Sequence, residues 1–265
     1  MAELERLPGK APDGLFTVPF REHEGPAGFG DVLAAPGGLV HEIFTDEPRN
    51  SGPALGFTLG LAQRLRQPRR PALVYLQLTS DTAETGLPYA PGLAHFGIEP
   101  DQIVLGRVDT LTALLWALEE AISCRAVAAV LADVSGSPER LDFTASRRLS
   151  LRAAAAGTSA FLLRYGRTRE ASAARLRWRV LPARSGEQAF DPRAPGPPRF
   201  AVTLEKVRLG VRLQQFEGQS FELDWIDHGF VIVERDEATG AVAPDRAAVS
   251  RPQLPALGDR LRQAG

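Results

Sequence analysis

The chain has 265 residues, a formal net charge of −1 and 44% hydrophobic residues, enough for one α/β domain of ordinary size with appended segments. Charged residues make up 24%, so the composition is globular and excludes a fibrous or wholly disordered chain. The single cysteine, Cys124, excludes an intrachain disulfide and a cysteine-rich zinc site. No stretch approaches the roughly 18 consecutive apolar residues of a membrane span, so we expect a soluble, cytoplasmic protein without membrane contact.

Residues 1–37 are rich in proline and glycine, show no sustained period, and are predicted to be a flexible arm. From Gly38 onward, expected strands alternate with expected helices. The strands are expected at 39–44, 71–78, 102–106, 126–132 and 158–163, and the helices at 54–67, 89–96, 110–123 and 141–156. This alternation predicts a mostly parallel sheet in a three-layer α/β core over residues 38–184.

Two segments carry this prediction most clearly. In the helix over 110–123, one face collects apolar residues three and four apart, among them Leu114 and Leu118. The run from Ala126 to Ala132 is continuously apolar and ends in Asp133, which is typical of a central parallel strand buried on both faces.

The alternation stops after Arg164. Strands without intervening helices are expected at 176–181, 199–208, 220–225 and 230–234, and residues 191–198, with four prolines, form a linker. The sequence therefore predicts a mainly β extension over 185–237, followed by a flexible tail over 238–265.

Arginine is concentrated in one segment. Between Arg140 and Arg184 there are eleven arginines against only two acidic residues. Because guanidinium pairs well with phosphates and carboxylates, the segment suits DNA or an acidic partner. The alternative is a set of solvated cations. The candidate contact residues on the helix over 141–156 are Arg147, Arg148 and Arg152.

A second set of candidates alternates along the strand over 176–181. Arg175, Arg177 and Arg179 share one face, and Leu176, Trp178 and Val180 share the other. Successive strand residues point to opposite faces. We therefore expect the apolar set to pack on the core and the three guanidinium groups to point outward, toward a partner or DNA.

Several segments resemble those of the ImuA family in the same order along residues 38–230. They are residues 39–44, 87–93, 113–120, 141–149 and 195–200. The resemblance implies a RecA-like core and an accessory role in DNA-damage-induced mutagenesis and translesion synthesis. It implies an ImuB-type polymerase-like protein and RecA as partners, with an error-prone replicative-type polymerase and DNA as further candidates.

The phosphate-binding loop of RecA-like proteins has the pattern G-x-x-x-x-G-K-[ST], in which the lysine neutralises phosphate and the hydroxyl binds Mg²⁺. Here residues 45–54 lack the first glycine and the lysine, and Pro53 and Ala54 stand in the last two positions. Asn50, Ser51 and Gly52 are therefore predicted to be a vestigial loop. Asp133 resembles the carboxylate that would bind Mg²⁺ through water.

We expect no cofactor and no efficient ATP hydrolysis, unless Arg49 replaces the missing cation. The four histidines share no metal-ligand spacing, so no metal site is predicted. The leading hypothesis is a non-catalytic adaptor. The alternatives are a divergent RecA-like ATPase and an inhibitor of cell division like the shorter SulA family, against which the long C-terminal extension speaks.

Overall fold

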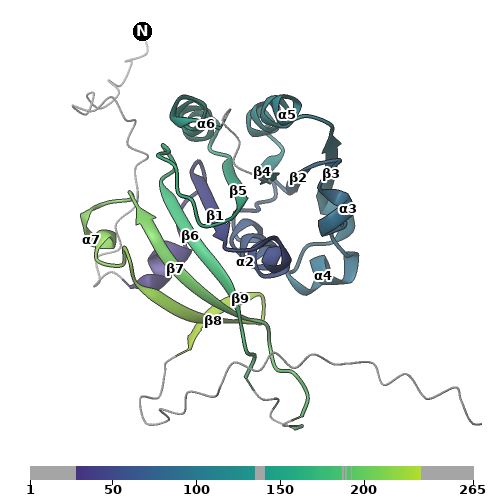
Figure 1. Cartoon of the computed structure of the whole chain (residues 1–265), viewed down its shortest axis with the longest axis vertical. Helices are drawn as coiled ribbons and strands as arrows, with labels where there is room; N and C mark the ends of the chain where they lie inside the picture. Colours follow the sequence, from purple (N-terminus) through teal and green to yellow (C-terminus); the bar gives the residue numbers. More distant parts are fainter. Residues whose placement is uncertain (1–27, 135–140, 187, 189, 192, 234–265) are drawn as a thin grey trace, which may run out of the picture. The chain divides into compact units, whose positions relative to one another are not determined.

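A computed structural model describes residues 28–134, 141–186, 188, 190–191 and 193–233. Residues 1–27 of the arm expected over 1–37, and the whole tail expected over 238–265, lie outside them. The described strands form one sheet in the order β3-β2-β4-β5-β1-β6-β7-β8-β9 (Figure 1). The strands are β1 Val40–Thr45, β2 Ala72–Leu78, β3 Ile103–Val108, β4 Val127–Val134, β5 Ser159–Tyr165, β6 Leu176–Ala183, β7 Arg199–Val207, β8 Ser220–Ile226 and β9 Gly229–Val233.

The strands confirm the expected fold class, a mostly parallel α/β core with a β extension. Strands β1 to β6 pair in parallel, and β7, β8 and β9 each pair antiparallel with the strand before. The extension is thus not a separate layer, because it continues the same sheet beyond β6. This is the RecA-like arrangement, in which β5 lies between β1 and β4.

Helices cover both faces of the parallel part of the sheet, with α5 and α6 on one side and α2 on the other (Figure 1). The helices are α1 Phe29–Leu33, α2 Ser51–Gln63, α3 Thr82–Thr85, α4 Ala90–His95, α5 Leu111–Ser123, α6 Phe143–Ala156 and α7 Val211–Gln214, with 3-10 turns η1 Pro48–Asn50 and η2 Pro100–Gln102. Among the described residues, no helix is long and apolar enough to cross a membrane.

Local sequence explains where the long helices begin and end. The Asp142 carboxylate accepts a hydrogen bond from the Ala145 N–H at 2.7 Å and so caps the start of α6. Gly157 ends that helix with a φ of 68°, a left-handed conformation that glycine adopts without strain. Helix α2 begins at Ser51 rather than at the expected residue 54, because Pro53 is tolerated in the first turn, where no N–H donor is needed.

The β extension packs against α2 through two glycines. Gly56 and Gly60, one helical turn apart, leave room for aromatic rings that come from outside the helix. A Cβ on Gly60 would lie 2.5 Å from the Phe230 ring and 2.8 Å from the Trp225 ring. Both aromatic residues belong to the extension, so the extension and the parallel core share one hydrophobic cluster.

The N-terminal segment differs from expectation between residues 28 and 37, where an arm was predicted. Phe29, Val32 and Leu33 of α1 are buried, and the Phe29 ring stacks on that of Phe221 with 3.6 Å between centroids. Their spacing is helical, but five residues are too few to give the sustained period by which a helix is recognised in a sequence.

Candidate functional site

The fold brings the predicted loop and the predicted carboxylate to one edge of the sheet. Because β1 and β4 are parallel, their carboxyl ends meet at the same edge, and α2 begins there too. Ser51 and Gly52 at the start of α2 line a cavity of about 150 Å³ together with Asp133 from β4. Asn50, directly before them, is the N-terminal cap residue of α2, and its side chain makes no capping hydrogen bond.

The loop between β1 and α2 is short, and its charged residues pair within the protein. Arg49, the candidate replacement for the loop lysine, forms an ion pair with Glu47 and is largely exposed. Arg179 donates to Asp46 from Nε to Oδ1 at 3.0 Å, and this hydrogen bond lowers the pKa of Asp46 below its usual value. Asp46 therefore keeps its negative charge beside the loop.

Asp133 is 2% exposed, and other side chains already occupy one of its oxygens. The Tyr75 hydroxyl donates to Oδ2 at 2.9 Å, and Gln77 Nε2 lies 3.4 Å from the same oxygen. Burial raises the pKa of Asp133, and the hydroxyls of Tyr165 and Tyr75 act in the opposite direction. Oδ2 of Asp133 is thus engaged by neighbouring side chains, whereas Oδ1 makes no hydrogen bond of normal geometry within the described residues.

The residues around Asp133 were not singled out in the sequence. Tyr75 and Gln77 lie two apart on β2, and Tyr165 ends β5, so all three reach the carboxyl edge of the sheet. In the sequence, these residues could have been recognised as polar or aromatic residues near the carboxyl ends of otherwise apolar strands. We call this cavity the tyrosine pocket. The described residues that line it are Ser51, Gly52, Leu55, Tyr75, Gln77, Thr85, Gly86, Leu87, Pro88, Tyr89, Asp133 and Tyr165.

The arginines of α6 fall into two groups. Arg148 and Arg152 form ion pairs with Glu119 of α5, at 2.6 and 3.2 Å. Arg147 is exposed, and the exposed side chains of Phe143 and Leu151 lie four residues before and after it on the same face. Of the three predicted contact residues on α6, Arg147 is therefore the one that lies in an exposed stripe with apolar side chains on both sides.

The outward row of guanidinium groups expected on β6 is wrong for Arg177, whose side chain is 12% exposed. Arg177 pairs with Glu42 of β1 at 2.8 Å and donates to the Glu170 carbonyl at 2.8 Å. The opposite face behaves as expected, since Leu176, Trp178 and Val180 are buried.

Arg177 is largely buried because the connection between β5 and β6, which contains no helix, lies over its side chain. Residues 166–175 cross over β1 and cover the face on which the arginines lie, and Ser172 Oγ donates to Glu42 at 2.7 Å. Arg179 pairs with Asp46, and Arg175 Nη1 donates to the Arg208 carbonyl at 3.2 Å. Glu42 of β1 and Asp46, directly after this strand, thus hold two of the three predicted arginines.

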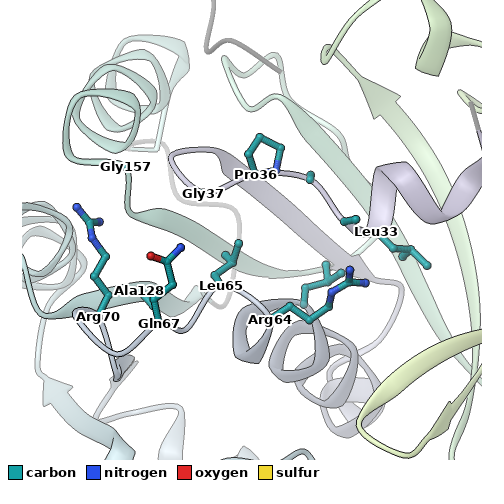
Figure 2. A pocket seen from close by; sticks show the side chains of 12 residues that line it. Leu33, Pro36, Gly37, Arg64, Leu65, Gln67, Arg70, Ala128 and Gly157 are labelled. Atoms are coloured by element: carbon teal, nitrogen blue, oxygen red, sulfur yellow. The ribbon is translucent and has the colours of Figure 1, made fainter. Parts of the chain in front are cut away.

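A second cavity, of about 430 Å³, lies at the opposite edge of the sheet (Figure 2). Its wall includes Gly37 before β1, Ala128 at the start of β4, and Gly157 before β5. Arg70 reaches toward the end of α6 and donates to the Ala156 carbonyl at 2.7 Å and to Thr158 Oγ1 at 3.0 Å. Arg70 therefore satisfies the carbonyl end of α6, and none of the predicted site residues lies here.

Known proteins provide an independent comparison. No family model matches the chain. The chain is 31% identical over 188 residues to Protein ImuA of Caulobacter vibrioides, in both strain NA1000 / CB15N and strain ATCC 19089 / CIP 103742 / CB 15. The match covers 66% of this chain and 72% of each relative. With the ordered segments and the RecA-like sheet, this identity shows that the chain belongs to the ImuA family.

Proposed function

We propose that the protein is a non-catalytic adaptor in DNA-damage-induced mutagenesis and translesion synthesis. The observation that carries this proposal is membership of the ImuA family, at 31% identity to the Caulobacter proteins. In this role it binds an ImuB-type polymerase-like protein and RecA, and brings them to an error-prone replicative-type polymerase.

The geometry of the loop supports a role without ATP hydrolysis. Pockets for nucleotide-sized ligands have volumes of about 300–1,000 Å³, and the tyrosine pocket has about 150 Å³. A triphosphate needs neutralising cations, whereas Asp46 and Glu47 place negative charge beside α2, and Arg49 is paired with Glu47. The residues present do not fit a bound nucleotide with Mg²⁺.

The surroundings of the predicted contact arginines, on α6 and on β6, support contact with a protein more than contact with DNA. Of the six predicted contact arginines, Arg148, Arg152, Arg177 and Arg179 form ion pairs with carboxylates. Such pairing lowers the net positive charge that phosphate binding requires. Arg147 stands between two exposed apolar side chains, a combination that is typical of protein interfaces, where arginine and aromatic residues are enriched.

The test is induced mutagenesis in the bacterium from which the protein comes. We expect deletion to reduce the frequency of mutations after DNA damage to the uninduced level, and the intact gene to restore it. Arg147→Glu should fail to restore it at unchanged protein abundance. Arg125→Glu, which reverses an exposed charge before β4, should restore it. An unchanged mutation frequency in the deletion strain would contradict the proposal.

Nucleotide assays distinguish the adaptor from a divergent ATPase. A ligand that binds the folded state raises the melting temperature. Since we expect MgATP not to bind, it should leave the melting temperature unchanged. Turnover that disappears in Asp133→Ala would favour the ATPase. Filamentation of cells on overexpression would favour an inhibitor of cell division.

A further inference from the structure

The protein contains three tyrosines, and all three line the tyrosine pocket. Tyr75 comes from β2, Tyr165 from the end of β5, and Tyr89 from the segment before α4. Tyr89 is 74% exposed at the mouth, whereas Tyr75 is buried at the floor. Residues distant in sequence thus build a small slot with aromatic walls at the edge where α2 begins.

The floor of the pocket contains a buried carboxyl group, that of Asp133. Asp133 Oδ1 and the Tyr165 hydroxyl are buried without a hydrogen-bond partner of normal geometry among the described residues. The charge of Asp81 also acts on Asp133 and contributes to its raised pKa. Among the described residues that line the pocket, none is a lysine, arginine or histidine. The Tyr165 hydroxyl acts on the pKa of Asp133, but Oδ1 makes no hydrogen bond of normal geometry, and such a buried oxygen favours a cation or a strong hydrogen-bond donor from outside.

Two further properties narrow the class of ligand. Aromatic faces attract cations, and small aromatic cages are the usual way in which proteins bind alkylated ammonium groups. Leu87 and Tyr89 are exposed at the mouth, where they can pack along an aliphatic stem. A volume of about 150 Å³ leaves room for one long side chain and not for a nucleotide.

We propose that the tyrosine pocket binds the cationic end of a lysine or arginine side chain presented by a protein partner. The stem lies between Leu87 and Tyr89, and the charge points toward Asp133. This inference rests on the proposed adaptor function, because it assigns one contact through which a partner is held.

The experiment uses the full-length protein with ¹³C-labelled tyrosine rings, so that every labelled signal reports on the pocket. The protein is titrated separately with N-acetyl-arginine amide, N-acetyl-lysine amide, and the neutral isostere N-acetyl-citrulline amide. We expect saturable shifts of the tyrosine signals in the millimolar range with at least one cationic probe. The stronger cationic probe identifies the side chain. Citrulline should bind at least tenfold more weakly.

Two variants test which residues are responsible. Asp133→Asn keeps the shape of the side chain and should weaken the cationic probe about tenfold. Tyr89→Ala changes a residue that is 74% exposed and should weaken binding of the cationic probe as well. Absence of saturable shifts, or equal binding of citrulline and the cationic probes, would overturn the inference.

A titration of the same sample with MgATP separates this inference from the proposed function. Tyrosine shifts with MgATP would contradict the non-catalytic adaptor and, because the pocket would then take a nucleotide, this inference too. Failure of the cationic probes alone would overturn the pocket assignment and leave the adaptor proposal standing.

Discussion

His41 in β1 is buried, and neither ring nitrogen has a hydrogen-bond partner in the described structure. Its ring lies 4.4 Å from that of Phe161, centroid to centroid. Burial without a partner disfavours the charged form and lowers the pKa of His41 to about 3. The folded protein therefore keeps His41 neutral at pH values where the unfolded chain binds a proton.

This difference predicts a loss of stability in acid. Because the pKa of His41 falls from 6.5 to about 3 on folding, stability is complete above pH 6.5 and declines as the pH falls toward 3. We expect the wild type to lose about 2 kcal/mol more than His41→Phe between pH 7 and pH 5. Urea unfolding at both pH values measures this. An equal loss in the two proteins would show that His41 does not titrate in this way.

The chemistry around Asp133 was only partly predictable from single residues. The end of an apolar strand identified Asp133, and the missing lysine identified the altered loop. Its hydrogen bond from Tyr75 spans 58 residues, and no local pattern reports a contact of that range. The tyrosine pocket therefore became evident only when the order of the strands was known.

At the scale of elements, a buried group of charged side chains holds the crossover from β5 to β6 against β1. Glu42 and Arg164 have side chains 3% and 4% exposed, and Arg177 and Ser172 complete the group around Glu42. The Arg169 guanidinium lies 4.0 Å from the centroid of the Phe44 ring on the same face of β1. Charge pairing and a cation–π contact therefore hold this crossover against the face of the sheet, which elsewhere is covered by packed crossover helices.

Removing the central carboxylate should destabilise the fold strongly. In Glu42→Gln, Arg177 loses its carboxylate partner and Arg164 keeps only its pair with Glu170, at a cost of about 3 kcal/mol. Chemical denaturation of the purified variant gives the change in the free energy of unfolding.

Glu47→Gln is the matched control, because it breaks the largely exposed pair with Arg49 and should cost less than about 0.5 kcal/mol. Similar effects of the two substitutions would contradict the special role of the buried group.

The alternating arginines show why this element was misjudged. An alternation of apolar and charged residues is typical of a strand with one solvated face. In β6 the charged face is covered, and Arg177 pairs with a glutamate 135 residues away. The periodicity was correct about which residues share a face, but it contains no information about what lies over that face.

At the scale of the whole molecule, the alternation of strands and helices predicted the parallel core and the β extension well, because each element buries a recognisable apolar face. It did not reveal that both parts share one core, since that depends on the small size of Gly56 and Gly60. A glycine within a helix is normally unfavourable and gives no hint of the aromatic rings that approach it.

This joint between α2 and the extension gives a further prediction. Gly60→Ala places a Cβ against the Phe230 and Trp225 rings, and we expect a loss of about 1–3 kcal/mol from overpacking. Gly52→Ala, on the same helix but with open space around the new atom, should be neutral or stabilise by up to about 1 kcal/mol. Thermal unfolding of both variants measures the contrast, and a neutral Gly60→Ala would show that the rings move aside.

The position of β1 has a consequence for synthesis of the chain. Of the described strands this one is made first, yet its partners in the sheet arrive late, since Val40 pairs opposite Ala160 and His41 opposite Leu176. At about 5–20 residues per second, a ribosome needs several seconds or more to make the missing strands. Throughout that time a strand that is fully buried in the folded protein has two unpaired edges, and long-range pairing of this kind is slow. We therefore expect stable folding of the sheet around β1 only after β6 has been made.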